Sequence, residues 1–211
     1  MTAAPAAVIF DLGGVVFESP LDEIARYEAE FDLAPGVVNR TVHHSGQAGA
    51  WARHERGEVD RVTFLGLFEG ELAQAGAVVD AEALMHRIDR SITPRPVMVA
   101  AVRTLRTAGR SVAAVTNNWT PFPAGGIRLE FDVFVESVAE GVRKPEPEIY
   151  RRCLQRLGVE AAQAVMLDDL GPNLKPARQM GMATIKVTET GQALRDLEAI
   201  TGVRFAGVSS A

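Results

Sequence analysis

Residues 6–15 read AAVIFDLGGV, and this stretch decides the fold. Its apolar run up to Phe10 is continuous rather than alternating, as expected for a strand that is covered on both faces. The run ends at Asp11, and Gly13 and Gly14 follow, so backbone without side chains can approach a ligand beside the carboxylate. The stretch therefore predicts a buried parallel strand with a carboxylate at its tip.

Similar apolar runs recur later in the chain, and each ends in a polar or glycine-rich turn. They are residues 112–115, followed by Thr116; residues 164–167, followed by Asp168; and residues 183–187, followed by Thr188. Segments with helical periodicity lie between the runs and stop at Gly109, Gly158 and Gly181. This alternation predicts an α/β protein with a Rossmann-like parallel sheet, whose ligand site lies at the carboxyl ends of the strands.

The stretch between the first strand and the rest of the sheet reads as helices only. Ser19 and Pro20 form a helix start signal, and the sequence TPRP at 93–96 predicts a stiff hinge back into the sheet. We therefore predict a core of residues 1–15 and 97–211 and an inserted helical cap of residues 16–96.

Composition narrows the classes of protein. The 211 residues carry a net charge of -5 and show no basic patch, which gives no support to nucleic-acid binding. No apolar stretch approaches the roughly 20 residues that span a bilayer, and the N-terminus lacks a basic signal-peptide region. A single cysteine, Cys153, excludes an intrachain disulfide and is predicted to pack in the core. We expect a soluble cytoplasmic protein without membrane contact, either a monomer or a homodimer.

The residues at the strand ends are chemically coherent. The Asp11 carboxylate can attack phosphorus and form an aspartyl-phosphate. Thr116, Asn117 and Asn118 offer hydroxyl, amide and backbone N–H groups to phosphoryl oxygens. Lys144, held between prolines in RKPEP, is a cation that can neutralise the transferring group.

Two adjacent carboxylates, Asp168 and Asp169, complete the set. Together with Asp11 they provide the hard oxygen ligands that Mg²⁺ prefers, and Asn173 can steady the lysine or the metal shell. Each residue alone is more often a turn or capping residue. Their succession at strand ends of one predicted sheet indicates a phosphoryl-transfer site.

Four segments resemble the four motifs of the haloacid dehalogenase superfamily. They are FDLGGV (10–15), VTN (115–117), GVRKPEPEIY (141–150) and MLDDLGPNLKPARQMGM (166–182). With TNNW at 116–119, they are similar to the N-terminal phosphatase domain of soluble epoxide hydrolase and its relatives in acyl-CoA dehydrogenase family member 10. The resemblance implies a Mg²⁺-dependent phosphatase that acts on small phosphate esters through Asp11, with the Gly13 carbonyl as a further metal ligand. We expect no epoxide hydrolase domain, because 211 residues leave no room for it.

The sequence departs from the family pattern at Gly13, where most family phosphatases carry a second aspartate that moves the leaving-group proton. Five residues of the predicted cap have side chains that could, by chemistry alone, replace the missing acid: Glu18, His43, His44, Glu55 and Glu58. For each of them a structural or solvated role is commoner. The loop from 118 to 132 is shorter than in the epoxide hydrolase relatives. Trp119 is a candidate substrate contact, and Trp51 is expected to pack within the cap.

Three functions stay open at this point. The first is hydrolysis of sugar or other organic phosphates, with lipid phosphates included by analogy. The second is 2-haloacid dehalogenation, which needs no metal and is disfavoured by Asp168 and Asp169. The third is a non-catalytic phosphate-binding module, suggested by Gly13 in place of the acid/base aspartate.

Overall fold

The computed structural model describes residues 4–205, and within them the strands form one parallel sheet. The strands are β1 (Ala7–Phe10), β2 (Ser111–Thr116), β3 (Val133–Glu136), β4 (Ala164–Asp168) and β5 (Ala183–Lys186). Their order is β3-β2-β1-β4-β5, and every pairing is parallel. The predicted α/β Rossmann-like class is confirmed. Because β1 lies between β2 and β4, the polar residues at these three strand ends share one edge of the sheet.

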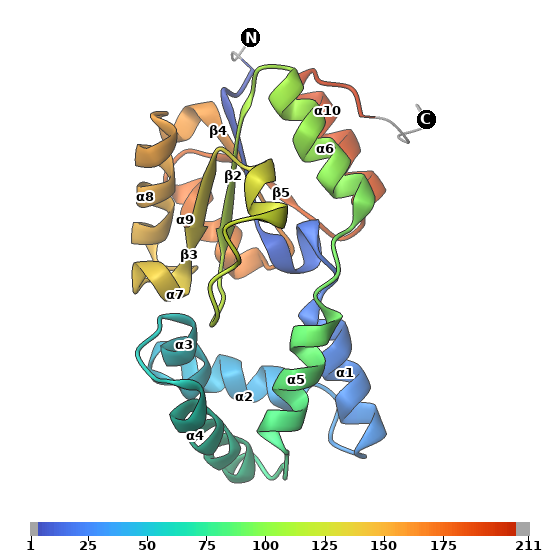
Figure 1. The fold of residues 1–211 in the computed structure, drawn as a ribbon, viewed down its shortest axis with the longest axis vertical. Coiled ribbons are helices and arrows are strands. Elements are labelled where there is room, and N and C mark those ends of the chain that lie inside the picture. The colour runs from blue at the N-terminus through green and yellow to red at the C-terminus, as the bar shows by residue number, and fades with distance from the viewer. Residues whose placement is uncertain (1–3, 206–211) are drawn as a thin grey trace.

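Helices cover both faces of the sheet (Figure 1). Helices α6 (Pro96–Thr107) and α10 (Thr190–Thr201) pack on one face, and α8 (Pro147–Leu157) and α9 (Gly171–Gln179) pack on the other. Along β1, Val8 and Phe10 join the first of these two cores, and Ile9 joins the second. All three side chains are fully buried, which explains why the run is apolar without alternation.

Strand β3, with the sequence VFVE, was not predicted. It has four residues, it lies at the edge of the sheet, and half of it is only partly buried. Its apolar run, VFV, has three residues between Asp132 and Glu136, which is too short to distinguish it from a loop. It is followed by the short helix α7 (Ser137–Glu140).

The predicted core position of Cys153 is confirmed. This residue of α8 is completely buried beside Ile149 and Leu174. Burial raises the pKa of its thiol to about 12, so the thiol stays protonated and unreactive at neutral pH.

The stretch between β1 and α6 is helical, as predicted. It contains α1 (Pro20–Glu30), α2 (Val37–Ser45), α3 (Ala50–Glu55), α4 (Arg61–Gln74) and α5 (Ala81–Ser91). These helices surround a separate apolar cluster that includes Phe64, Phe68 and Leu84. Helix α1 begins as expected: the Ser19 hydroxyl accepts a hydrogen bond from the Leu21 N–H, with a donor–acceptor distance of 3.3 Å.

Two short connectors join α1–α5 to the sheet (Figure 1). Phe17 and Pro94 form an antiparallel bridge, and the Arg95 N–H donates to the Val16 carbonyl at 2.8 Å. The TPRP segment is thus one side of a paired ribbon. The division into a core of 1–15 and 97–211 and a cap of 16–96 stays a prediction, and residues 1–3 and 206–211 of that core lie outside the described residues. None of the helices in residues 4–205 is long and apolar enough to cross a membrane.

Candidate active site

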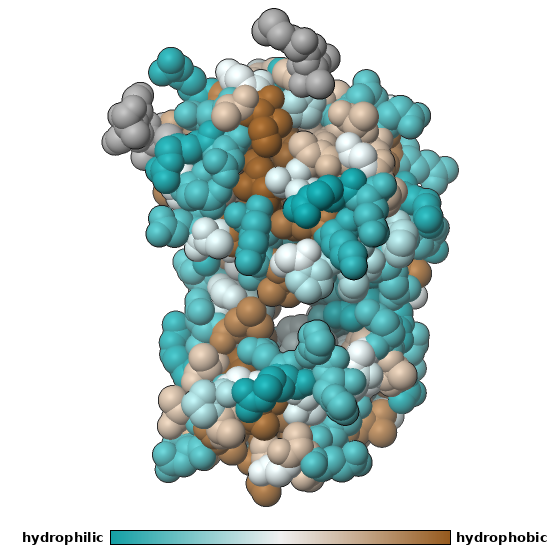
Figure 2. All heavy atoms as spheres, turned by 180° about the vertical axis from the view of Figure 1, so that it is seen from behind, coloured by the Kyte–Doolittle hydropathy of each residue, from teal (hydrophilic) through white to brown (hydrophobic). Residues whose placement is uncertain are grey.

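A pocket of about 680 Å³ lies between the carboxyl ends of the strands and the helices α1–α5. From behind, the molecule is hollowed at the level where the two parts meet (Figure 2). Most of the predicted site residues line this pocket: Asp11, Gly13, Thr116, Asn117, Asn118, Lys144, Asp169 and Asn173. Asp168 lies directly behind them, in contact with Lys144. The structure therefore brings all the predicted site residues together.

Asp11 is held in place by two donors. Its Oδ1 accepts from the Leu12 N–H at 2.6 Å and lies 2.7 Å from Lys144 Nζ. Burial raises the pKa of Asp11 well above its ordinary value, although the positive charge of Lys144 acts in the opposite direction. The carboxylate is consequently fixed in orientation and poorly solvated, two properties that favour a nucleophile.

Lys144 lies between two carboxylates. Its Nζ is 2.7 Å from Asp11 and 2.7 Å from Asp168, and its side chain is 1% exposed. Burial alone would lower the pKa of this ammonium group, but the two carboxylates outweigh burial and raise it. The lysine therefore stays charged across the working pH range.

Asp168 is fully buried and has its acceptor sites occupied. The Leu170 N–H donates to Oδ1 at 2.8 Å, and the amide of Asn173 lies 3.1 and 3.2 Å from the two oxygens. Lys144 occupies Oδ2. Asn173 thus steadies Asp168, which in turn positions the lysine.

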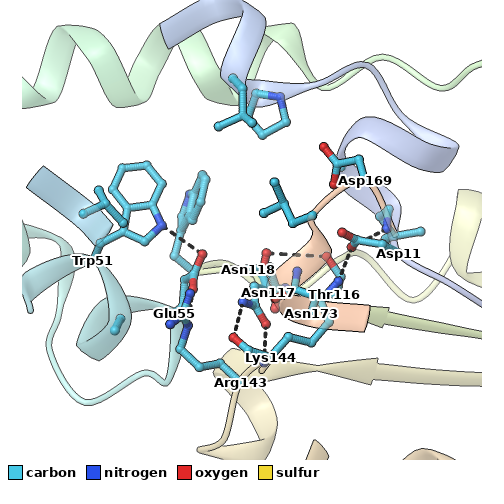
Figure 3. A pocket seen from close by; sticks show the side chains of 18 of the residues that line it. Asp11, Trp51, Glu55, Thr116, Asn117, Asn118, Arg143, Lys144, Asp169 and Asn173 are labelled. Carbon is cyan, nitrogen blue, oxygen red and sulfur yellow. Dashed lines mark hydrogen bonds and ion pairs between the residues drawn. The ribbon is translucent and has the colours of Figure 1, made fainter. Parts of the chain in front are cut away.

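Asp169 faces the pocket beside Asp11 (Figure 3). Carboxylate oxygens of Asp11, Asp168 and Asp169 lie within 4.8 Å of one another. Burial, followed by the charge of Asp168, raises the pKa of Asp169 to about 6. Three carboxylates beside one lysine leave excess negative charge, and hard oxygen donors in this arrangement fit a magnesium ion.

Gly14 leaves the space that the Asp169 carboxylate occupies beside Asp11. It adopts φ +72°, and a Cβ at this position would stand 2.3 Å from Asp169 Oδ2. A side chain here would therefore displace the carboxylate, which explains the second glycine of the quoted stretch.

The residues that follow β2 serve mainly to hold the loops together. The Asn117 amide donates to the Lys144 carbonyl at 3.0 Å and accepts from the Lys144 N–H at 2.8 Å. The Asn118 amide donates to Glu136 at 2.9 Å. Their side chains thus position the lysine and anchor the loop after β2. The Asn118 N–H is also used within the protein, since it donates to the Ser137 hydroxyl at 2.9 Å, and the Thr116 hydroxyl is the group of this loop best placed for a ligand.

Two tryptophans form an aromatic wall of the pocket. Trp51 and Trp119 lie edge to face, with ring centroids 5.6 Å apart. The Trp119 indole N–H donates to Asp89 at 3.1 Å, and that of Trp51 donates to Glu55 at 2.9 Å. Trp51 also packs against Phe68, as expected, but sequence reasoning missed its place in the pocket wall. Nothing in the local sequence indicates that it lines the pocket.

Only some of the proposed replacement acids line the pocket. Glu18, His43 and Glu55 line the pocket, whereas His44 and Glu58 do not. Glu55 is 2.5 Å from the Arg143 guanidinium, and Glu18 is 3.0 Å from that of Arg95. Both carboxylates are therefore ion-paired acceptors.

Comparison with known proteins establishes the family. The model of haloacid dehalogenase-like hydrolases matches residues 5–181. The chain belongs to this family of hydrolases, and the resemblance carried by its four motifs is confirmed.

Three named relatives match most of this chain. The chain is similar to acyl-CoA dehydrogenase family member 10 of Mus musculus, with 36% identity over 93% of this chain. It is also similar to bifunctional epoxide hydrolase 2 of Sus scrofa, with 33% identity over 94% of this chain. The chain spans 19% and 39% of the lengths of these two relatives. A sesquiterpene phosphatase of Aspergillus oryzae shares 24% identity, over 93% of this chain and 96% of its own length.

Solved structures share the fold. A haloacid dehalogenase family enzyme from Bacteroides thetaiotaomicron, in complex with magnesium and inorganic phosphate, gives a TM-score of 0.58 at 17% identity, covering 86% of this chain and 93% of that chain. The L-2-haloacid dehalogenase of Xanthobacter autotrophicus gives 0.58 at 19% identity, covering 98% and 92%. At these identities the two comparisons support the fold alone.

Proposed function

We propose that the chain is a magnesium-dependent phosphatase that hydrolyses small phosphomonoesters through an aspartyl-phosphate on Asp11. One observation carries the proposal: the Asp11 carboxylate, oriented by Lys144, lies beside Asp169 at the base of a pocket. A nucleophile, a fixed cation and a carboxylate pair are the groups that phosphoryl transfer requires.

Asp11 and Asp169 are the proposed magnesium ligands, together with the carbonyl of Gly13. The bound ion would offset the charge of the carboxylates and of the phosphoryl oxygens. Lys144 neutralises charge on the transferring group, and the Thr116 hydroxyl and nearby backbone N–H groups bind its oxygens. Asp168 is proposed to position Lys144 rather than to bind the metal directly, because its oxygens are already occupied by Lys144, Leu170 and Asn173.

The reaction proceeds in two displacements. An oxygen of Asp11 attacks phosphorus, the bond to the leaving oxygen breaks, and an aspartyl-phosphate forms. Water then attacks the same phosphorus, the bond to Asp11 breaks, and phosphate leaves with the carboxylate restored. Pocket walls that exclude bulk water favour the first step over side reactions.

The pocket favours an apolar organic group over a sugar. Its walls beyond the aspartates include Leu21, Ile24, Val42, Trp51 and Phe122. Apolar and aromatic walls bind carbon skeletons by burial, and the polar lining residues, such as Asn39, Gln47 and Thr120, are fewer. The sesquiterpene phosphatase among the relatives supports the same choice. We therefore place phosphates of apolar organic groups ahead of sugar phosphates.

The other two functions are less well supported. A dehalogenase that needs no metal has no use for Asp169 beside the nucleophile, and a binding module has no use for Lys144 bonded to Asp11. A small-molecule phosphate ester is the proposed partner, while nucleic acid and membrane are not. A cytoplasmic location and a monomeric or homodimeric state stay predictions.

The test is phosphate release from a panel of aryl, alkyl and sugar phosphates, with Mg²⁺ and with EDTA. Wild type is compared with Asp11→Asn and with Asp196→Asn, which changes an exposed aspartate on α10. We expect release that requires both Mg²⁺ and Asp11 and that Asp196→Asn leaves unchanged. Halide release from 2-chloropropionate in EDTA would support the dehalogenase instead. Stabilisation by beryllofluoride without turnover would support the binding module.

A further inference from the structure

Building on the proposed phosphatase function, we infer that this site selects its substrates by the leaving group: it turns over efficiently only phosphates whose leaving oxygen departs without a proton. Aryl, enol and acyl phosphates belong to this class, whereas phosphates of simple alcohols do not. The inference rests on which groups surround the place where the leaving oxygen must lie.

In-line displacement fixes that place. The leaving oxygen lies on the side of phosphorus opposite Asp11, and so toward α1–α5. Lys144 cannot serve it, because its Nζ is held between Asp11 and Asp168, on the nucleophile's side of phosphorus. The Asp169 carboxylate lies against the backbone of Gly14, at the same strand tip as Asp11.

The segment that leads from the strand tip to the cap provides no acid. Gly13 has no side chain, and the ring of Pro20 stands directly over it. A Cβ at Gly13 would be 3.3 Å from Pro20 Cδ, so the space beside Gly13 is occupied by carbon. Neither residue carries a proton that can be transferred to a leaving oxygen.

The carboxylates on the cap side of the pocket are all committed to ion pairs. Glu55 accepts from Arg143, and Glu18 accepts from Arg95. A third pocket carboxylate, Asp89 on α5, lies 3.2 Å from an arginine of α4 and accepts the Trp119 indole N–H. Each of these three carboxylates is thus already engaged as an acceptor by a neighbouring cation or indole N–H.

His43 is the remaining pocket residue that could donate a proton. It lies on α2, with its side chain exposed to solvent. Because the structure shows it facing water, we expect it to take no part in the reaction, and it provides a direct control.

Without a donor, the first step depends on the leaving group alone. The bond between phosphorus and the leaving oxygen breaks, its electron pair stays on that oxygen, and the group departs as a phenolate, enolate or carboxylate. The second step also lacks a positioned base, so water attacks the aspartyl-phosphate slowly and at the same rate for every substrate. The aromatic wall of Trp51 and Trp119 suits a flat aryl group in this position.

The experiment uses the full chain with Mg²⁺ and a series of aryl phosphates of graded phenol acidity, plus an alkyl phosphate of matched size. Because general acid catalysis is worth about 10²–10⁴-fold, we expect kcat/KM for the alkyl ester to fall at least 10²-fold below that for the most acidic phenol. Rapid mixing should show a burst of phenol close to one per active site. The later steady rate should be the same for all activated esters.

Alkyl and aryl esters with kcat/KM values within tenfold of each other, and no burst, would overturn the inference. His43→Gln should leave the dependence on phenol acidity unchanged. If kcat/KM depends weakly on phenol acidity in wild type and strongly in His43→Gln, then His43 is the donor. This result also overturns the inference. A chain that releases phosphate from no ester in the series refutes the proposed function itself, and the inference with it.

Discussion

Asp169→Asn should make the metal-free protein more stable, although it removes a group needed for activity. Burial and the neighbouring charge of Asp168 raise the pKa of Asp169 from 3.8 to about 6. Each pKa unit corresponds to about 1.4 kcal/mol, so the difference sets a ceiling of about 3 kcal/mol on the cost of ionising this carboxyl in the fold. Solvent reaches part of the Asp169 side chain and screens its charge. We therefore expect the actual ionisation cost to be about 1–2 kcal/mol.

The sign follows from proton linkage. The folded protein holds the Asp169 proton more tightly than the unfolded chain, so this residue destabilises the fold above pH 6 and costs nothing below pH 3.8. The advantage of Asp169→Asn should therefore be full at pH 7.5 and should shrink as the pH falls through the window between these two values.

Urea unfolding in EDTA at pH 7.5 and at pH 4.5 measures the difference. Asp196→Asn, which changes an exposed aspartate, serves as the matched control and should show no such change. Added Mg²⁺ should stabilise wild type and leave Asp169→Asn unaffected, because a ligand that binds only the folded state raises its stability.

Two results would refute this reasoning. One is a variant that is no more stable than wild type at pH 7.5 in EDTA, because the carboxylate would then carry no ionisation cost in the fold. The other is equal stabilisation of both proteins by Mg²⁺, because the ion would then bind without Asp169.

Further substitutions test the rest of the site. Gly14→Ala should lower stability by about 1–2 kcal/mol through its positive φ and should weaken Mg²⁺ binding by displacing Asp169, as calorimetry with the metal would show. Lys144→Met leaves two buried carboxylates without their cation and should cost about 3–5 kcal/mol at pH 8, and less at pH 5, in urea unfolding. Glu55→Gln should cost about 1–3 kcal/mol, because it leaves the Arg143 guanidinium without its carboxylate, and thermal unfolding would measure it. Retention of wild-type stability in any of these variants would contradict the contact on which it is based.

The fold and the strand-tip residues were predictable because each depends on local sequence. A buried parallel strand must be apolar throughout, and the residue after Phe10 must then lie at the edge of the sheet. Asp11, Thr116 and Asp168 each follow such a run, and parallel pairing alone brings them together. The edge strand Val133–Glu136 escaped prediction because its apolar run is only three residues long, between Asp132 and Glu136.

The walls of the pocket were not predictable, because they depend on contacts between distant segments. Trp51 meets Trp119 across 67 intervening residues, and Glu55 meets Arg143 across 87. The roles of the Asn117 and Asn118 side-chain amides were also not predictable from the sequence. The composition of TNN suggests phosphate contacts, but the structure uses Asn117 to hold the backbone of Lys144.

The packing of Gly13 against Pro20 connects the sequence departure to the proposed chemistry. Pro20 is the first residue of α1, where its ring favours helix initiation, and its Cδ lies 3.3 Å from the place where a Cβ at Gly13 would stand. A side chain at this position would require the Pro20 ring to give way by a few tenths of an ångström. The Gly13→Asp and Pro20→Ala substitutions therefore belong together: the double variant has room for a proton donor beside the leaving oxygen, whereas Gly13→Asp alone must push against the helix. The absence of an acid at this position is a property of the local packing as well as of a single residue.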